Sequence, residues 1–259
     1  MRYQVRCAVL CLLAAALSLG LAQAASAVDM PAPVKAPVAA PVYNWTGVYI
    51  GGNIGYGWGK SDNDFADAVT GFGTVPMGSD TTNVNGVIGG LQAGYNWQTG
   101  SFVFGLETDV QLSGQKGSGA AICPAASCGP GGTVTHTEQL TWFGTARGRL
   151  GWAFDRWLIY GTGGLAYGTV ESSGSVNFFV PVRLTGPYSD SATRVGWVAG
   201  AGLEGAITRN WTARVEYLYI DFGTANFSSP TMFPLAAGAI TDSMHLRDNI
   251  VRVGLNYRF

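Results

Sequence analysis

The chain has 259 residues, of which 47% are hydrophobic and only 12% are charged, and its net charge is −1. Because there is no excess of basic residues to meet phosphate groups, this charge excludes a nucleic-acid-binding role. Ordinary soluble domains are about 25% charged. The low charge, the 38 glycines and the 8 tryptophans, 11 tyrosines and 12 phenylalanines favour a barrel whose outer wall faces lipid.

Residues 1–27 have the pattern of a secretory signal peptide. Arg2 and Arg6 precede an apolar run, and small-x-small cleavage motifs follow at residues 22–24 and 25–27. The apolar run is shorter than the roughly 20 residues that a membrane-spanning helix needs. No later segment is apolar for that length, so no helical span is expected.

Residues 28–43 contain several prolines at short spacing. Proline fixes φ and removes a backbone donor, so we expect an extended lead-in segment that runs through the periplasm. Binding of a partner by this segment is a second interpretation. Residues 44–259 are expected to form one outer-membrane β-barrel domain, with no separate domain after it.

Eight segments of the barrel region alternate between apolar and small or polar residues. A period of two is typical of a strand with two different faces. The last segment shows this most clearly, because Val251, Val253 and Leu255 alternate with Arg252 and Asn256. The predicted strands are residues 46–59, 84–98, 101–115, 137–153, 156–171, 193–208, 211–223 and 244–259.

The breaks between these segments are short and long in turn. Tight turns are predicted at residues 98–101, 153–156 and 208–210, and long Gly-, Ser-, Thr- and Asp-rich loops at 60–83, 116–136, 172–192 and 224–243. Outer-membrane barrels have short periplasmic turns and long extracellular loops. The pattern predicts an all-β fold, an eight-stranded antiparallel transmembrane β-barrel with four long extracellular loops. It would lie in the cell outer membrane of a Gram-negative bacterium, with both termini periplasmic.

Aromatic residues lie near both ends of the predicted strands. Amphipathic rings prefer the two interfaces of a bilayer, so we expect two aromatic belts. The periplasmic belt is predicted to hold Trp45, Trp97, Phe102, Trp152, Trp157, Trp211, Tyr257 and Phe259. The outer belt is predicted to hold Trp58, Trp142, Tyr167, Trp197 and Tyr219.

Charged residues fall on the inward face of the predicted strands, at similar depth. The set is Glu107, Asp109, Arg147, Arg149, Glu204, Arg214, Glu216 and Arg252. An eight-stranded barrel is just wide enough for side chains to fill, and unpaired charges there are costly, so the acids and arginines are expected to pair. We interpret the set as a structural salt-bridge plug. A gated proton or ion path through the same layer is the alternative, while a glycosidase-like acid pair would need a substrate cleft.

Cys123 and Cys128 remain after removal of the signal peptide, and in an exported chain they favour a loop disulfide. A zinc site with His136 is the alternative. His136 and His245 are the only histidines, and no motif ties either of them to a serine such as Ser243. We therefore predict no catalytic residue, no metal and no cofactor.

The end of the chain carries an expected signal for insertion. An apolar strand face that finishes on an aromatic residue suits recognition by the barrel assembly machinery. The residues of this face are Val251, Val253, Leu255, Tyr257 and Phe259.

Three stretches resemble a known family. Residues 44–59 (NWTGVYIGGNIGYGWG), 217–223 (YLYIDFG) and 249–259 (NIVRVGLNYRF) are similar to the small outer-membrane immunogenic or "porin family" barrels of alphaproteobacteria, which have an OmpA-like transmembrane fold. The resemblance covers about residues 28–259. It implies eight antiparallel strands, Sec export, insertion by the barrel assembly machinery and roles in envelope integrity or host contact. It supplies no catalytic residues, and the porin label does not establish a pore.

The main functional hypothesis is an integral outer-membrane barrel with a structural, envelope-integrity and surface-display role, plugged inside by salt bridges. Display would serve as an antigen or in host contact. A small gated channel or porin for ions or small solutes is the alternative, and a lipid-modifying barrel enzyme is the third reading. The expected partners are outer-membrane lipid and lipopolysaccharide, the barrel assembly machinery and a host or surface ligand bound through the loops.

Overall fold

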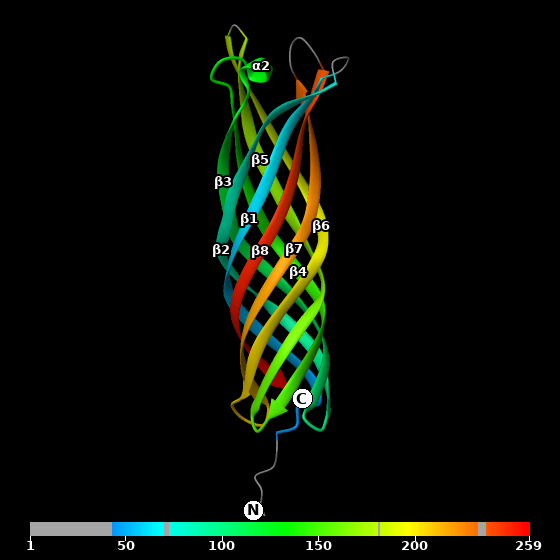
Figure 1. Cartoon of the computed structure of the whole chain (residues 1–259). Helices are drawn as coiled ribbons and strands as arrows, with labels where there is room; N and C mark the ends of the chain where they lie inside the picture. The colour runs from blue at the N-terminus through cyan, green and yellow to red at the C-terminus, as the bar shows by residue number, and fades with distance from the viewer. Residues whose placement is uncertain (1–42, 70–72, 181, 233–236) are drawn as a thin grey trace, which may run out of the picture. The chain divides into compact units, whose positions relative to one another are not determined.

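The computed structural model describes residues 43–69, 73–180, 182–232 and 237–259, all of which belong to the compact unit Pro41–Phe259. The predicted signal peptide, and the lead-in up to residue 42, lie outside the described residues. Eight antiparallel strands close into a barrel in which each strand pairs with its sequence neighbours and β8 pairs with β1 (Figure 1). The predicted eight-stranded barrel is confirmed. The strands are β1 (Gly47–Val69), β2 (Gly73–Thr99), β3 (Phe102–Ile122), β4 (Thr133–Phe154), β5 (Trp157–Val180), β6 (Val182–Ala206), β7 (Trp211–Met232) and β8 (Ala237–Arg258).

The alternation in sequence becomes an inside and an outside wall. On β8, Ile250, Arg252 and Asn256 are buried in the interior, whereas Val253 and Leu255 are 49% and 52% exposed on the outside. Successive side chains of a strand point to opposite faces, so each strand contributes one row to the interior and one to the outer wall. No helix in the described part of the chain is long and apolar enough to cross a membrane.

One end of the barrel, called here the turn end, carries the tight connections. Two residues, Gly100 and Ser101, join β2 to β3, and Asp155 and Arg156 join β4 to β5. Gly100 has φ of 60°, which glycine adopts without steric cost. The N-terminal end of the described barrel and the C-terminus also lie at the turn end (Figure 1).

The opposite end of the barrel is called here the far end. The prediction of four long loops is corrected by the strands that the structure has there. Most of residues 60–83, 116–136, 172–192 and 224–243 is strand, and pairing continues, for example from Lys60↔Asn83 to Val69↔Gly73. The strands continue because every added residue pair satisfies more backbone groups while the inward row still buries side chains. A short helix, α2 (Ala125–Cys128), lies between β3 and β4 at this end (Figure 1).

Two aromatic belts mark the outer wall. Near the turn end, Trp97, Trp152 and Trp211 are 46–48% exposed, and toward the far end Trp58 and Trp197 are 44% and 50% exposed. Exposed Leu, Val and Ile side chains fill the band between the belts. We take this band as the membrane-spanning part, because apolar side chains there would otherwise face water.

Trp45 does not lie in the periplasmic belt, where the sequence analysis placed it. It is completely buried and packs inside the turn end with Val103, Leu158 and Tyr160. Its backbone N–H donates to Gln98 Oε1 at 2.6 Å. Because Trp45 precedes β1, which begins at Gly47, it is not bound to the alternation of that strand and turns into the mouth of the barrel.

The interior is built in layers. A lower apolar cluster around Trp45 and Leu158 closes the turn end, and a charged layer follows it. A middle apolar cluster around Phe143 and Leu218 separates this layer from a second polar layer, and an upper apolar cluster around Val134 closes the far end. Along β4 from the turn end, the inward side chains are Ala153, Arg149, Arg147, Thr145, Phe143, Leu140, Glu138, His136 and Val134.

Candidate functional site

The candidate site is the charged layer in the membrane-spanning part of the barrel. The structure places all eight of the predicted charged side chains in the interior, each no more than 5% exposed. They come from β3, β4, β6, β7 and β8, where each lies on the inward row. The residues are Glu107, Asp109, Arg147, Arg149, Glu204, Arg214, Glu216 and Arg252. The structure therefore brings together the whole predicted set.

Glu107 is the centre of the layer. Arg214 donates to both of its carboxylate oxygens, and Arg147 Nη2 donates to Oε1. Tyr49 donates its hydroxyl to Oε2 at 2.6 Å. The guanidinium groups of Arg252 and Arg149 lie further away, at 3.7 and 4.0 Å. The carboxylate of Glu107 is thus surrounded by four arginines. Their positive charge exceeds the negative charge of Glu107, and the other acids of the layer balance the remainder.

Asp109 and Glu216 supply part of that balance. Arg147 bridges them, with Nη2 at 3.0 Å from Asp109 Oδ2 and Nη1 at 3.1 Å from Glu216 Oε1. Arg252 bridges the same two acids, at 3.0 Å from Asp109 and through Nε at 2.8 Å from Glu216 Oε2. Forked guanidinium groups suit this bridging geometry, because their N–H donors point in fixed directions.

Glu204 holds the side of the layer nearest the turn end. Arg149 Nη2 donates to it at 2.7 Å, Asn256 Nδ2 at 2.9 Å and Thr212 Oγ1 at 2.5 Å. The guanidinium carbon of Arg149 also lies 3.9 Å from the centre of the Tyr160 ring, a cation–π contact. Each acid of the layer thus meets at least one arginine at hydrogen-bond distance.

Neutral side chains complete the network, and the sequence analysis missed them. Gln92 Oε1 accepts from Arg214 at 2.6 Å, and its Nε2 donates to Asn256 Oδ1 at 2.6 Å. Tyr160 donates to Glu216 at 3.0 Å, and Thr145 to Asp109 at 2.8 Å. The sequence pattern does place these residues in the interior, because each lies on the inward row of its strand at the depth of the charges.

The charged layer has equal numbers of acids and arginines and is enclosed by apolar residues. Four carboxylates face four arginines, and apolar clusters lie on both sides of the layer. The described residues contain no group of three or more His, Cys, Asp and Glu side chains that could hold a metal ion. The chemistry present is mutual neutralisation, because each carboxylate is engaged by several donors.

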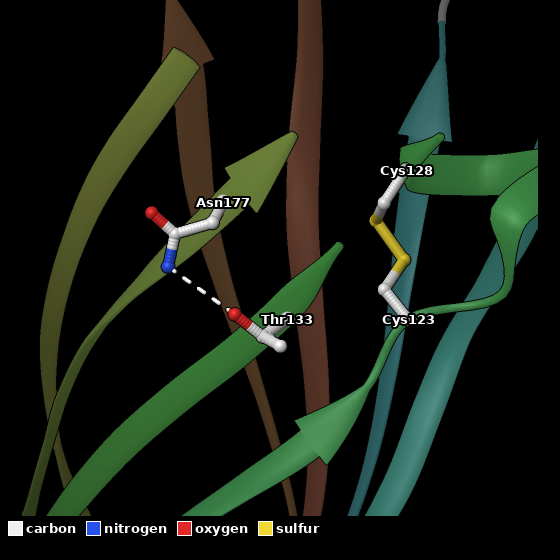
Figure 2. The surroundings of a disulfide bond; sticks show 4 residues. All are labelled: Cys123, Cys128, Thr133 and Asn177. Carbon is white, nitrogen blue, oxygen red and sulfur yellow. Dashed lines mark hydrogen bonds between the residues drawn. A yellow bond between two sulfur atoms is a disulfide. The ribbon is translucent and has the colours of Figure 1, made fainter. Parts of the chain in front are cut away.

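Cys123 and Cys128 form a disulfide with a Cα–Cα distance of 5.8 Å, which ties the end of β3 to α2 (Figure 2). Both are buried in the upper apolar cluster. Nearby, Asn177 Nδ2 donates to Thr133 Oγ1 at 3.3 Å and links the ends of β4 and β5 (Figure 2). The cysteines therefore bond to each other, so their sulfurs are not thiolate ligands for zinc.

The two histidines lie apart from each other and from the charged layer. His136 Nε2 lies 2.7 Å from Thr82 Oγ1 and 3.3 Å from Asn63 Nδ2, and His245 Nε2 lies 3.0 Å from Asp221 Oδ1. Within the described part of the chain, neither histidine is hydrogen-bonded to a serine.

The expected assembly face is displayed on the outer wall of β8. Three aliphatic side chains are 41–52% exposed there, and Phe259 is 71% exposed beside the ring of Tyr257, with 5.2 Å between centroids. The aliphatic residues are Val251, Val253 and Leu255. The face is continuous with the apolar band, so it is accessible from outside the barrel.

Comparison with known structures gives barrels of low sequence identity. The attachment invasion locus protein Ail of Yersinia pestis matches with a TM-score of 0.37 and 13% identity, over 83% of this chain and 99% of that chain. The outer membrane protease OmpT of Escherichia coli matches with a TM-score of 0.44 and 11% identity, over 82% and 97%. These scores are too low to support an argument about function.

Comparison with known sequences is more informative. The chain is 39% identical over 224 residues to the 31 kDa outer-membrane immunogenic protein of Brucella melitensis, covering 84% of this chain and 85% of that protein. It is 30% identical over 216 residues to the 22 kDa outer membrane protein of Rhizobium leguminosarum bv. viciae, covering 83% and 79%. A family model described as outer membrane protein beta-barrel domain matches residues 10–259. The chain is therefore an outer-membrane protein of Gram-negative type and belongs to the outer membrane protein beta-barrel domain family, alongside the immunogenic proteins of Brucella.

Proposed function

We propose that the protein is a non-enzymatic barrel that supports the outer membrane and displays its far end at the cell surface, as an antigen or in host contact. Its turn end and both termini would face the periplasm. The observation that carries the proposal is the self-neutralising charged layer, which fills the barrel where a conducting path or a substrate cleft would have to run.

The cost of separating buried ion pairs favours a plug over an ion-conducting path. Removing one partner of a buried ion pair typically costs about 3–5 kcal/mol, because the other charge is left uncompensated in a poorly solvated interior. A permeating ion would have to break several such pairs around Glu107 at once. It would then meet the middle apolar cluster, in which Phe143, Leu218 and Ile250 are completely buried.

A hollow along the outer wall does not contradict this reading. Its volume is about 1370 Å³, and its lining combines exposed side chains of the outer wall, such as Ile54, Leu91 and Leu255, with the inward residues Gln92, Asp109 and Arg214. The exposed apolar part of this lining faces lipid rather than an aqueous path. Outer-membrane lipid and lipopolysaccharide are therefore the partners that we propose for the apolar band, and the barrel assembly machinery for the face that ends at Phe259.

The experiment compares a deletion strain with strains complemented by the wild type. We expect the deletion to increase sensitivity to detergents and to large antibiotics that the outer membrane normally excludes. Unchanged sensitivity would contradict the envelope role. The purified protein, checked for heat-dependent gel migration as a test of folding, should give no conductance steps above leak in planar bilayers. Reproducible steps would favour a channel, and a changed lipid A acyl pattern in the deletion strain would favour a lipid-modifying enzyme.

A further inference from the structure

A second polar layer lies in the far half of the barrel, beyond the belt that contains Trp58. We call it the outer chamber. It is bounded toward the membrane by the middle apolar cluster and toward the far end by the upper apolar cluster, which contains the disulfide. Its inward side chains are Ser61, Asn63, Asp80, Thr82, His136, Glu138, Ser172 and Asp242.

The outer chamber holds carboxylates that its own residues do not neutralise. Glu138 and Asp242 are 1% and 2% exposed, and none of their four carboxylate oxygens has a hydrogen-bond partner in the structure. This contrasts with Glu107 in the charged layer, which receives donors from two arginines and a tyrosine. An ionised carboxylate with no counterion is costly in such a site.

The histidine of the chamber does not act as the counterion. His136 Nε2 lies 3.7 Å from both Glu138 Oε1 and Asp80 Oδ2. Asn63 Nδ2, a donor, lies 3.3 Å from the same nitrogen, and Thr82 Oγ1, which can donate or accept, lies 2.7 Å from it, so the contact with Asn63 favours an accepting Nε2 and a neutral ring. Burial lowers the pKa of His136, and the charge of Asp80 only partly offsets this.

The surrounding strands bring further negative groups. In addition to burial, the charges of Glu138 on β4 and Asp64 on β1 raise the pKa of Asp242 on β8. Tyr188 and Asp190 come from β6, and Arg194 on the same strand interacts with Asp190. Ser61 and Asn63 on β1 favour ionised Glu138, whereas Ser172 on β5 lies beside Tyr188. Among the side chains that the structure describes around the two buried carboxylates, acids thus outnumber bases.

We propose that Glu138 and Asp242 form a proton-operated lock on the far end of the barrel. With both carboxyls protonated, the outer chamber is neutral and the far end stays closed. With both ionised, their mutual repulsion and their need for water loosen the strands above the outer belt. The charged layer inside the membrane, which carries the proposed function, is not altered by this step.

The direction in which pH changes the stability of the closed form follows from the pKa shifts of Glu138, Asp242 and His136. Burial raises the pKa of Glu138, and burial together with the charges of Glu138 and Asp64 raises the pKa of Asp242 to about 7. A raised carboxyl pKa favours the closed form at low pH, and this contribution is lost as pH rises from the ordinary carboxyl range, about 4, to about 7. The lowered pKa of His136 acts in the opposite direction, since the closed form is disfavoured as pH falls below the usual histidine range. Two carboxyls oppose one imidazole, so the net effect is loosening with rising pH.

A metal ion is the other occupant that could neutralise these carboxylates. The described residues contain no group of three or more His, Cys, Asp and Glu side chains arranged to hold one. The proton is therefore the ligand that the geometry favours, and added calcium becomes a separate arm of the test.

The disulfide provides a reporter for the lock. Cys123 and Cys128 are 3% and 0% exposed in the cluster that covers the chamber, so a soluble trialkylphosphine reaches them only when the far end loosens. We expect the rate of disulfide reduction in the folded wild type, followed by thiol labelling and mass spectrometry and divided by the rate for an exposed small-molecule disulfide at the same pH, to rise about tenfold from pH 5 to pH 8, equivalent to one unit of net pKa shift. A rate that is flat over this range in the wild type overturns the proposal.

Variants assign the effect to the two carboxyls. Glu138→Gln and Asp242→Asn should each reduce the pH dependence, and the double variant should remove it. Asp62→Asn is the matched control, because Asp62 lies on the outer wall with a side chain 42% exposed, and it should keep the wild-type profile. A double variant that folds and keeps the profile contradicts the lock. Suppression of reduction by calcium at pH 8 in the wild type, but not in the double variant, would show a cation site instead. If the double variant fails to fold, the single variants and the wild-type profile still decide.

Discussion

The substitution Glu107→Gln tests the charged layer most directly. It keeps the size of the side chain but removes one negative charge, so three carboxylates then face four arginines. Arg147 and Arg214 lose their shared ionic partner, and Arg252 and Arg149 lose a nearby charge at 3.7 and 4.0 Å. We expect a loss of about 3–5 kcal/mol in the free energy of unfolding, the usual cost of leaving a buried charge uncompensated.

Two matched variants separate this cost from a general effect of removing a carboxylate. Asp62→Asn removes an ion pair with Arg247 on the outer wall, where both side chains are more than 40% exposed, and should cost about 0–1 kcal/mol. Glu107→Gln combined with Arg214→Gln restores neutrality, so the double variant should be more stable than the sum of the two single losses by about 0.5–3 kcal/mol.

The assay is equilibrium urea unfolding of the barrel in lipid vesicles, followed by tryptophan fluorescence and by heat-dependent gel migration. Equal losses from Glu107→Gln and Asp62→Asn would refute the reasoning, because burial would then make no difference to the charge. Strict additivity in the double variant would refute it as well, since the two residues would not be energetically coupled.

Three further predictions concern the ends of the barrel. Trp45→Ala should cost about 3–5 kcal/mol in urea unfolding, because it removes a completely buried ring at the turn end, whereas a loss near that of Asp62→Asn would contradict the packing. Phe259→Ala should lower the yield of folded protein in the outer membrane, measured by heat-dependent gel migration of membrane fractions, and an unchanged yield would argue against an assembly signal. Replacing Cys123 and Cys128 by serine should leave gel migration intact but speed proteolysis at the far end, consistent with a staple worth about 2 kcal/mol, and equal proteolysis rates would contradict it.

The strand alternation made the barrel and its charged layer predictable. Side-chain direction in a strand is a local property, so Arg147, Arg149 and Glu216 could be placed inside from neighbouring residues alone. Counting from the tight turns then gave their common depth. The neutral partners Gln92 and Tyr160 lie on the same inward rows, but uncharged residues carry no requirement for pairing that would single them out.

The length of the strands and the place of Trp45 were not predictable by the same means. In the far half, Ser, Thr, Gly and Asn occupy much of the outer row, and isolated apolar residues such as Phe65, Met77 and Val176 mark the inner one. Hydrophobic periodicity is faint there, and the composition is that of loops. Trp45 lies before the first paired residue, where no strand fixes its direction.

The two polar layers differ in a way that follows from their surroundings. Within the membrane, water cannot reach a charge that loses its partner, so the layer around Glu107 is stable only because arginines from β4, β7 and β8 meet an acid on β3, partly across the barrel interior. Beyond the outer belt the barrel wall faces water, and loosening the strands would hydrate Glu138 and Asp242 at once. An unbalanced set of carboxylates can therefore exist in the outer chamber but not in the charged layer. We infer that the same physical cost underlies both proposals, a lasting plug in the charged layer and a response to protons in the outer chamber.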